Sequence, residues 1–371
     1  MKVVAVSHTG LLSGAERVLL GQLNHLVSLG HDVTLACADG PLADEASITG
    51  LTVERIRELK PGRGPRVLAL VGLAFNHAMT ARPLRRLAQN ADVVLFNSAL
   101  ALPATGGRHL GPPTGLFIHD VMIQSDRKAI LRLFHTAVNR AFAVSNAAAA
   151  YARSLEIDTR VLFNGARFEI RDSDVAMTMR STDPVVVGIV AALTPWKGHE
   201  SLLEAISLVP DVHLEILGAP FPGDSEYEAS LKRRAQLPDL AGRVHFLGHR
   251  PDVAEIMRRW SLSISASIEP EAGPLVVLES MALALPVVAT ALGGTLEVLG
   301  DAGVHVPPND PPAMAAAITN LLEDTAAWKR CSAAGPRAIR GGLSLTDALQ
   351  RFSNELAELA QREMSAPLGP R

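Results

Sequence analysis

The sequence predicts an α/β protein built from two consecutive doubly wound domains, each with a parallel sheet covered by helices on both faces. The chain has 371 residues, which suits two α/β domains better than one. Short β-branched runs alternate with longer stretches of helical periodicity, and these runs are continuously apolar, as parallel strands buried on both faces are. The same alternation restarts after a polar stretch near the middle of the chain.

In the first half, Gly30 ends a helical stretch that starts near residue 15, in which leucines recur at helical spacing. This helical stretch lies between the first two predicted strands. The runs that predict strands in this half are 2–7, 32–37, 51–56, 92–97, 115–119 and 141–145.

Residues 166–184 are polar and without periodicity, which predicts a linker. The strands predicted after it are 185–191, 212–217, 244–247, 262–266, 286–289 and 304–306. Two such sheets in succession place a ligand cleft between the domains, where the carboxyl ends of both sets of strands meet. The predicted organisation is a first domain (1–170), a second domain (171–345) and a C-terminal segment (346–371). The helix of that last segment packs back on the first domain and ends in a disordered tail.

The charge balance excludes a generic nucleic-acid binder, because the formal net charge is −3. The charge is divided unequally along the chain. Residues 1–170 carry 18 Lys and Arg against 13 Asp and Glu, whereas residues 171–371 carry 17 against 25. A basic first half favours an acidic acceptor or an anionic surface as its partner.

The two cysteines, Cys37 and Cys331, form neither a disulfide framework nor a metal-ligand cluster, so we expect a reducing compartment and no metal. The opening MKVVAVSHTG has the pattern of a strand and a loop rather than of a signal peptide. The longest apolar run, 67–75, is too short to cross a membrane. We therefore expect a cytoplasmic protein.

Residues 54–86 hold eight basic side chains against two acidic ones around the apolar run VLALVGLAF. Basic residues flanking an apolar helix are typical of a segment at an anionic membrane surface, which would place the protein at the inner face of the membrane. The alternative is a core helix with solvated basic ends, and the sequence leaves both open. The basic side chains are Arg55, Arg57, Lys60, Arg63, Arg66, Arg82, Arg85 and Arg86.

The segment EPEAGPLVVLESMALALPVVAT (269–290) carries the most chemistry. A helix is expected from about Pro274 to Leu285, ending before Pro286. Its first turn offers backbone N–H groups and the positive end of a helix dipole, which suit a phosphate. Two carboxylates flank that turn, Glu271 in the loop before it and Glu279 further along the helix. Each can accept hydrogen bonds from hydroxyl groups.

This segment resembles the E-x7-E signature of the family-4 retaining glycosyltransferases of GT-B architecture, followed by a Gly-Gly-x-x-Glu turn at 293–297. The resemblance extends in order along the chain: SGAERVLLGQLNHLVSLGHDV (13–33), FIHDV (117–121), AVSNA to VLFNGARF (143–168), VVVGIVAALTPWKGHESLLEAI (185–206), LEILGAP (214–220) and RVHFLGHRPDVAEIM (243–257).

The resemblance implies a role for each matching residue. Lys197 contacts the donor diphosphate, Glu271 holds the donor sugar and Glu279 binds the ribose. Gly14 lets the backbone approach the diphosphate, and His119 lies near the transferred sugar. Catalytic roles fall to His119, Lys197 and Glu271. The donor would also contact the start of the helix, at Ala272, Gly273, Pro274, Leu275 and Val276. The nucleobase would pass the loop formed by Gly248, His249 and Arg250.

One position departs from the family pattern, because Ala192 fills the slot in which the family usually has an arginine that shares the diphosphate. Either Lys197 and the helix amides suffice, or another cation such as Arg17 or Arg167 takes that place.

The predicted function is therefore retaining transfer of a sugar from a nucleotide-sugar donor, with UDP- and GDP-sugars favoured, to a carbohydrate, lipid-linked or small-molecule acceptor. The family implies that the first domain (1–170) is the acceptor side, that the second (171–345) binds the nucleotide-sugar, and that no cofactor is needed. Two alternatives stay open, a sugar-nucleotide epimerase of the same fold and a catalytically silent partner subunit. A nicotinamide dehydrogenase is disfavoured, because the loop after the first strand (10–14) lacks the G-x-G-x-x-G spacing.

Overall fold

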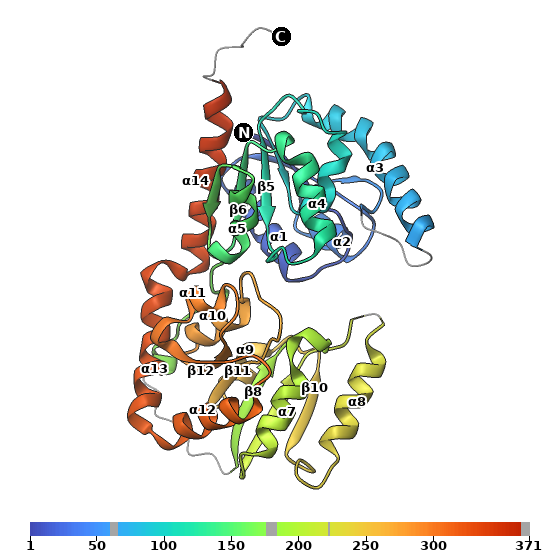
Figure 1. Ribbon diagram of the computed structural model, residues 1–371. Helices are drawn as coiled ribbons and strands as arrows, with labels where there is room; N and C mark the ends of the chain where they lie inside the picture. The colour runs from blue at the N-terminus through green and yellow to red at the C-terminus, as the bar shows by residue number, and fades with distance from the viewer. Residues whose placement is uncertain (60–65, 176–183, 222, 365–371) are drawn as a thin grey trace. The chain divides into compact units, whose positions relative to one another are not determined.

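The computed structural model describes residues 1–59, 66–175, 184–221 and 223–364 (Figure 1). The chain divides into two compact units: unit 1 comprises Met1–Asn164 and Thr346–Arg371, and unit 2 comprises Gly165–Leu345. Each unit contains one parallel sheet with helices, so the predicted fold class is confirmed. Residues 176–183 of the predicted linker and the predicted disordered tail at 365–371 lie outside the described residues.

The sheet of unit 1 has seven strands in the order β3-β2-β1-β4-β5-β6-β7. Each pair is parallel, and β1 lies between β2 and β4, with Val3 opposite both Val33 and Val93. All strands predicted for the first half are present. The short, half-buried β7 was not predicted as a separate strand. The strands are β1 (Lys2–Val6), β2 (Asp32–Cys37), β3 (Thr52–Arg55), β4 (Val93–Phe96), β5 (Thr114–Ile118), β6 (Arg140–Ala143) and β7 (Thr159–Val161).

The first helix of unit 1 begins at a capping box, in which the Glu16 carboxylate accepts a hydrogen bond from the backbone N–H of Ser13 at 3.2 Å. It ends where Gly30 adopts a left-handed conformation with φ of 81°. The helices of this unit are α1 (Gly14–Ser28), α2 (Pro41–Ile48), α3 (Arg66–Ala88), η1 (Ala99–Thr105), α4 (Ser125–Phe134), η2 (His135–Ala137), α5 (Asn146–Ser154) and α14 (Leu345–Met364).

The long helix α14 returns the end of the chain to unit 1 and lies beside β6 (Figure 1). Its Phe352 is fully buried, with ring centroids 5.8 Å from Phe117 and 6.3 Å from Phe142. Below these rings the Arg140 guanidinium, 1% exposed, bonds to Asp158 on one side and to the α14 carboxylate of Glu355 at 3.0 Å on the other. Aromatic packing and a buried charge therefore hold the helix against the sheet.

The sheet of unit 2 has the order β10-β9-β8-β11-β12-β13, again parallel throughout. All of its strands were predicted. They are β8 (Val185–Val190), β9 (Val212–Leu217), β10 (Val244–Gly248), β11 (Leu262–Ser265), β12 (Val287–Thr290) and β13 (Gly303–Val306). The helices are α6 (Asp172–Val175), η3 (Pro195–Lys197), α7 (His199–Ser207), α8 (Ser225–Ala235), α9 (Val253–Met257), α10 (Leu275–Ala282), α11 (Thr295–Val298), η4 (Gly300–Ala302), α12 (Pro311–Glu323), α13 (Thr325–Ala338) and η5 (Ile339–Leu343).

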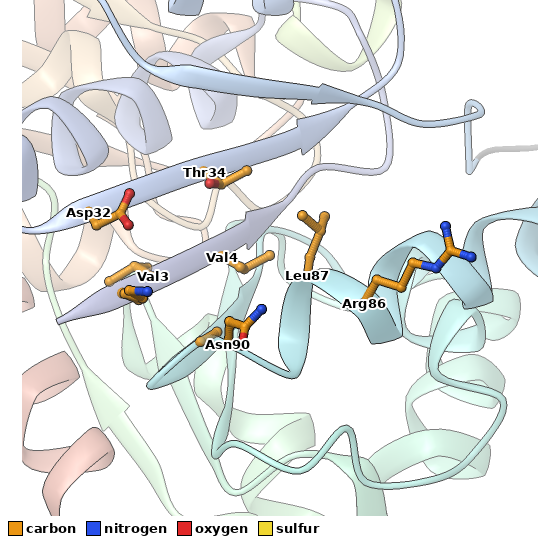
Figure 2. Close-up of a pocket in the computed structure, with 9 residues that line it drawn as sticks. Val3, Val4, Asp32, Thr34, Arg86, Leu87 and Asn90 are labelled. Atoms are coloured by element: carbon orange, nitrogen blue, oxygen red, sulfur yellow. The ribbon is translucent and has the colours of Figure 1, made fainter.

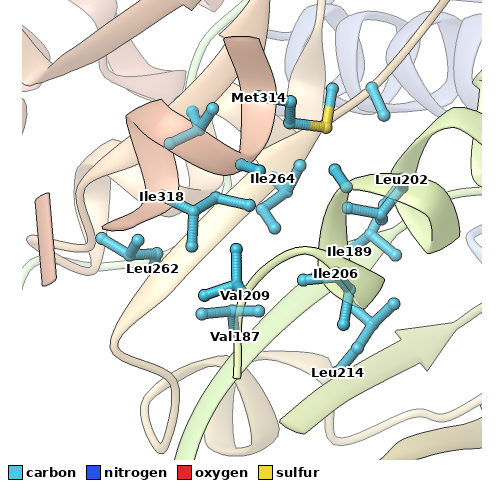
Figure 3. Packing of buried hydrophobic residues seen from close by; sticks show 14 of the residues in the cluster. Val187, Ile189, Leu202, Ile206, Val209, Leu214, Leu262, Ile264, Met314 and Ile318 are labelled. Atoms are coloured by element: carbon cyan, nitrogen blue, oxygen red, sulfur yellow. The ribbon is translucent and has the colours of Figure 1, made fainter. Parts of the chain in front are cut away.

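The core of unit 2 lies between its sheet and the helices α7 and α12 (Figure 3). Val187 of β8 and Ile264 of β11 point from the sheet towards Ile206 of α7 and Met314 and Ile318 of α12, and all five side chains are 0% exposed. Burying one such side chain contributes about 1.5–3 kcal/mol, so this cluster fixes β8 and β11 firmly beside each other.

Each sheet has one point at which the direction of the strand order reverses. In unit 2 this switch point lies between β8 and β11, and in unit 1 it lies between β1 and β4. The loops that follow the two strands at a switch point leave in opposite directions, and ligands of doubly wound sheets bind there, outside the carboxyl ends. We therefore expect the functional site to include the loops after β8 and β11 in unit 2 and after β1 and β4 in unit 1.

We predict that Gly188→Ala destabilises unit 2. A Cβ atom at this position of β8 would lie 2.1 Å from the ring of Trp260, which is 0% exposed. Overpacking of this kind costs about 1–3 kcal/mol, to be measured by urea denaturation. Gly21→Ala in α1 is the control, because no atom lies within 4 Å of the added methyl group, and alanine favours a helix interior by about 0.5–1 kcal/mol. Equal stability of Gly188→Ala and the parent chain would contradict this packing.

Candidate functional site

The loops after β8 and β11 are locked to each other at the switch point of unit 2. The backbone N–H of Ile268 donates to the carbonyl of Trp196 at 2.8 Å. Gly198 adopts a φ of 71°, and a Cβ there would lie 1.9 Å from the Ala266 carbonyl oxygen. Only glycine allows the two backbones to approach this closely. Lys197, between Trp196 and Gly198, is therefore held at a fixed point.

This contact between the two loops brings Lys197 and Glu271 together. The Lys197 ammonium lies 2.8 Å from Oε2 of Glu271 and 4.1 Å from the centroid of the Trp196 ring. The Ser267 hydroxyl donates to the other carboxylate oxygen of Glu271. The two charged side chains are only 17% and 16% exposed, so the pair is sheltered but still open to a ligand. A cation and a carboxylate preorganised in this way can bind different parts of one polar molecule.

The backbone of Glu271 is supported by the predicted Gly-Gly turn. The N–H of Gly294 donates to the Glu271 carbonyl at 2.7 Å. Gly293 has a φ of 56°, and a Cβ on it would lie 2.3 Å from that same oxygen. The Thr290 hydroxyl donates to the Ser267 carbonyl at 2.7 Å. The loop after β12 thus fixes the loop after β11 from the other side.

Helix α10 follows this loop and starts where it was predicted, but it ends earlier than predicted. It begins at Leu275, because Pro274 has an extended ψ of 90° and acts as the N-cap instead of the first helical residue. It ends at Ala282, before the predicted Leu285, because Ala284 turns the chain out with a φ of 54° ahead of Pro286. The N–H groups of its first turn have no acceptor within the helix, as at any helix start.

Glu279 lies on α10 and is 2% exposed. Its Oε1 receives a hydrogen bond from Nε of Arg167 at 2.6 Å and also contacts a terminal nitrogen of the same guanidinium. Burial raises the pKa of the Glu279 carboxyl, and the charge and hydrogen bonds of Arg167 oppose that rise. Arg167, considered above as a replacement cation, is thus paired with the predicted ribose ligand.

The empty arginine slot follows β8 and the predicted nucleobase loop follows β10, the two strands that flank β9 in the sheet. Ala192 follows β8 and is half-buried. Gly248 ends β10 with a φ of 67°, and its carbonyl accepts from Gly218 N–H at 2.9 Å. After it, His249 and Arg250 are exposed, and Arg250 forms two hydrogen bonds of 2.9 Å with Asp252. Contact of this loop with a nucleobase stays a prediction.

In unit 1, His119 follows β5 and Asn97 follows β4. Nε2 of His119 lies 2.8 Å from Oδ1 of Asn97, and its ring stacks on Phe117 with centroids 4.4 Å apart. Burial, with the nearby His8, lowers the pKa of His119 to about 3. The imidazole is therefore neutral at physiological pH, and the Asn97 oxygen selects the tautomer with hydrogen on Nε2.

Two further predicted residues lie on α1. Gly14 is its first residue and is exposed, and Arg17 is exposed one turn later. The carboxyl edge of the unit 1 sheet thus carries predicted residues in the loops after β1 and β5.

Sequence reasoning missed three contributors to these clusters. Asn97 orients His119, Ser267 bonds to Glu271, and the Trp196 ring lies beneath the Lys197 ammonium. Asn97 and Ser267 each lie within two residues of the end of a buried strand, which is the signal that could have identified them.

A surface hollow of about 190 Å3 lies at the opposite edge of the unit 1 sheet (Figure 2). Lys2, Asp32 and Thr34, from the first halves of β1 and β2, line it with Arg86 and Asn90. Because these are the amino ends of the strands, the hollow is separate from the residues predicted to carry function.

The described residues contain neither a cluster of metal ligands nor a membrane-spanning helix. Within the ranges that the structure describes, no group of three or more His, Cys, Asp and Glu side chains is arranged to hold a metal ion. In the same part of the chain, no helix is long and apolar enough to cross a membrane. The absence of a metal requirement stays an expectation from the family.

Two consecutive units, each with one doubly wound parallel sheet, define the class, a GT-B protein. Solved structures of this fold resemble the chain: HepE from Anabaena in complex with UDP (TM-score 0.80, 22% identity) covers 96% of this chain and 100% of its own. The sucrose-phosphate synthase from Thermosynechococcus elongatus reaches the same TM-score of 0.80 at 18% identity, covering 97% and 99%.

The family follows from sequence comparison. The family model described as Glycosyltransferase Family 4 matches residues 12–169, and the model described as Glycosyl transferases group 1 matches residues 172–338. The chain belongs to the family-4 glycosyltransferases, which confirms the predicted resemblance.

Curated relatives match over shorter segments. A phosphatidyl-myo-inositol mannosyltransferase from Mycolicibacterium smegmatis is 37% identical over 138 residues, 35% of this chain and 34% of that protein. The lipopolysaccharide core biosynthesis glycosyltransferase LpsE from Rhizobium meliloti is 29% identical over 171 residues, 45% of this chain and 48% of that protein. The matched segments therefore span a third to a half of these relatives.

We predict that the free energy of unfolding falls as the pH is lowered from about 6.5 to about 4. Burial lowers the pKa of His199, which is 0% exposed, to about 4 and that of His119 to about 3, from the ordinary histidine value of about 6.5. The unfolded chain binds these protons first, so the stability present above pH 6.5 is lost on acidification. His199→Phe and His199→Gln remove one such group, and both should flatten the slope of unfolding free energy against pH. An unchanged slope in both variants would contradict the burial of a neutral His199.

Proposed function

We propose that this chain transfers a sugar from a nucleotide-sugar donor to an acceptor hydroxyl, with the donor bound by unit 2. The observation that carries the proposal is the Lys197–Glu271 pair, held at a switch point beside the start of α10. A cation, helix N–H groups and two carboxylates in one place suit a molecule that combines a diphosphate with sugar hydroxyls. HepE, which shares the fold, has been solved with UDP and with UDP-glucose.

In the proposed reaction, the bond between the sugar C1 and the diphosphate oxygen breaks, and the nucleoside diphosphate leaves with the bonding electrons. The acceptor hydroxyl oxygen bonds to C1, and its proton passes to the leaving diphosphate or to water. Lys197 stabilises the charge that grows on the diphosphate, and Glu271 accepts hydrogen bonds from the sugar. Family membership supports retention of the anomeric configuration.

The proposal assigns Ala272 to Val276, which form the end of the loop before α10 and the start of that helix, to the donor and Glu279 to its ribose. UDP- and GDP-sugars are the proposed donors, and a carbohydrate, lipid-linked molecule or small molecule is the proposed acceptor. In unit 1, Gly14 and His119 serve the reacting groups. Because His119 is neutral, it acts there as a hydrogen-bonding group and not as a cation.

The test is release of nucleoside diphosphate from a panel of UDP-, GDP- and ADP-sugars, with and without candidate acceptors. A transferase gives acceptor-dependent release and a glycosylated product whose anomeric configuration is measured by NMR. Conversion of the donor sugar without an acceptor would identify an epimerase instead. Binding without turnover on any donor would identify a silent subunit.

On the true donor, Lys197→Ala is expected to lower kcat by about 100-fold to 1000-fold, because it removes a preorganised charge next to the leaving group. Lys232→Ala is the matched control, since Lys232 is half-exposed on α8 and pairs with Glu228 one turn away. The control should keep full activity. Retention of most activity by Lys197→Ala, with a folded protein by circular dichroism, would contradict the site assignment.

A specific feature of α3 supports an anionic membrane surface as the place of the acceptor. Val71, Phe75 and Met79 are 62%, 53% and 49% exposed and follow one another at four-residue spacing, so they form one apolar stripe on the helix. The stripe continues into exposed arginines at Arg82 and Arg86. An exposed apolar stripe beside positive charge suits the headgroup region of an anionic bilayer.

The other basic residues predicted for this surface lie in different environments from these exposed arginines. The Arg57 guanidinium lies over the Phe75 ring, 5.2 Å from its centroid, whereas Arg55 is partly neutralised by Asp39 at 3.3 Å. Lys60 and Arg63 lie outside the described residues, as does the side chain of Arg66. The buried face of α3, with Leu84 and Ala88, packs on unit 1, so it is the opposite face that would meet the lipid.

We expect the chain to float with vesicles of phosphatidylcholine and phosphatidylserine at low salt, but not with phosphatidylcholine alone. Replacing Arg82, Arg85 and Arg86 together by Ala should abolish flotation, because each charge near the surface contributes about 1 kcal/mol. The matched control replaces three exposed arginines elsewhere in unit 1 by Ala: Arg108, Arg132 and Arg153. Failure of the parent chain to bind anionic vesicles at low salt, or equal loss in both triple variants, would overturn this location.

A further inference from the structure

The diphosphate site of unit 2 is short of positive charge. Ala192 has a methyl group where the family usually has an arginine. The Lys197 ammonium is already paired with the Glu271 carboxylate at 2.8 Å. The inference that follows rests on the proposed function, because it concerns how the same donor is held. A nucleoside diphosphate carries at least two negative charges, which a single shared ammonium and the amides of α10 match poorly.

Arg167 lies on a fixed piece of backbone close to that site. Ala166 N–H donates to the Leu343 carbonyl at 2.9 Å, and Leu345 N–H donates to the Ala166 carbonyl at 3.1 Å. Gly165 completes the contact, since a Cβ there would lie 2.4 Å from the Ser344 carbonyl oxygen. The start of the Arg167 side chain is therefore fixed relative to the body of unit 2.

The position of Glu279 on α10 places the Arg167 guanidinium beside the first turn of that helix. Glu279 is one turn beyond Leu275, where α10 begins, and side chains on a helix lean towards its N-terminus. One turn is about 5.4 Å along the axis. A phosphate bound by the first-turn N–H groups would thus be a close neighbour of the guanidinium.

Arg167 and Glu279 each keep hydrogen-bonding atoms that the contact between them does not use. Nε and one terminal nitrogen of Arg167 both meet Oε1 of Glu279, so the guanidinium keeps N–H donors beyond this contact. The Arg167 side chain is 42% exposed although Glu279 is only 2% exposed. On the carboxylate, Oε2 is the oxygen that these two contacts do not use.

We infer that Arg167 supplies the second positive charge of the diphosphate site, in place of the arginine absent at position 192. Glu279 holds the guanidinium through Oε1, and the remaining N–H donors of the fork bond to a phosphate oxygen of the donor. Oε2 of Glu279 is then left for a ribose hydroxyl. One ion pair thereby serves both the phosphate and the ribose, and a planar guanidinium suits the phosphate geometry.

The test compares the affinities of Arg167→Met and the parent chain for UDP and GDP, and for uridine and guanosine, by isothermal titration calorimetry. A hydrogen bond between charged groups is worth about 1.5–3 kcal/mol, so we expect the variant to bind the preferred diphosphate about 10-fold to 100-fold more weakly. Affinity for the matching nucleoside should fall much less, because the nucleoside has no phosphate to lose the direct contact with Arg167. Adding Ala192→Arg to Arg167→Met should restore much of the diphosphate affinity.

Arg171→Met is the matched control, because Arg171 is 54% exposed four residues further on and pairs with Glu255 at 3.0 Å. It should bind the diphosphate as the parent does. Equal weakening of diphosphate and nucleoside by Arg167→Met would show that Arg167 only orders Glu279, and this would overturn the inference. Unchanged diphosphate affinity would overturn it too, while leaving the proposed function intact. A parent chain that binds no nucleoside diphosphate would overturn the proposed function, and this inference with it.

Discussion

The close approach of two loops at the switch point of unit 2 determines where every charged group of the proposed donor site lies. Gly198 lets the loop after β8 meet the loop after β11, and the hydrogen bond from Ile268 to Trp196 holds them together. A side chain at position 198 would push the loops apart by its contact with Ala266. Lys197 and Glu271 would then separate. The core beneath, shared by β8, β11, α7 and α12, turns this local contact into a rigid one.

The acidic groups of this site are each satisfied by a basic one. Glu271 pairs with Lys197, and Glu279 pairs with Arg167. A buried carboxylate without a partner would be costly, so the pairs keep the site folded while no donor is bound. In the proposed function, these pairs also supply the groups that bind the donor. The diphosphate would attract the two cations, and the sugar and ribose hydroxyls would offer the carboxylates replacement hydrogen bonds.

Much of the fold was predictable because it depends on local patterns. Continuous apolar runs marked the strands of both sheets, and helical spacing marked α1 and α14. The predicted C-terminal end of α10 was wrong, because the conformation of Ala284 depends on the turn that it completes. The Arg167–Glu279 pair joins residues far apart in the sequence, so no spacing could reveal it. Asn97 was missed for the same reason, since its role arises only when β4 and β5 lie side by side.

The two units differ in the kind of chemistry that they can offer. In unit 1, His119 is held neutral by burial and by its contact with Asn97, so it can orient a hydroxyl but cannot offset negative charge. In unit 2, Lys197 and the N-terminus of α10 supply positive potential. Departure of a nucleoside diphosphate creates negative charge on one group only. In the proposed reaction, we therefore assign the main electrostatic stabilisation to unit 2 and the positioning of the acceptor to unit 1.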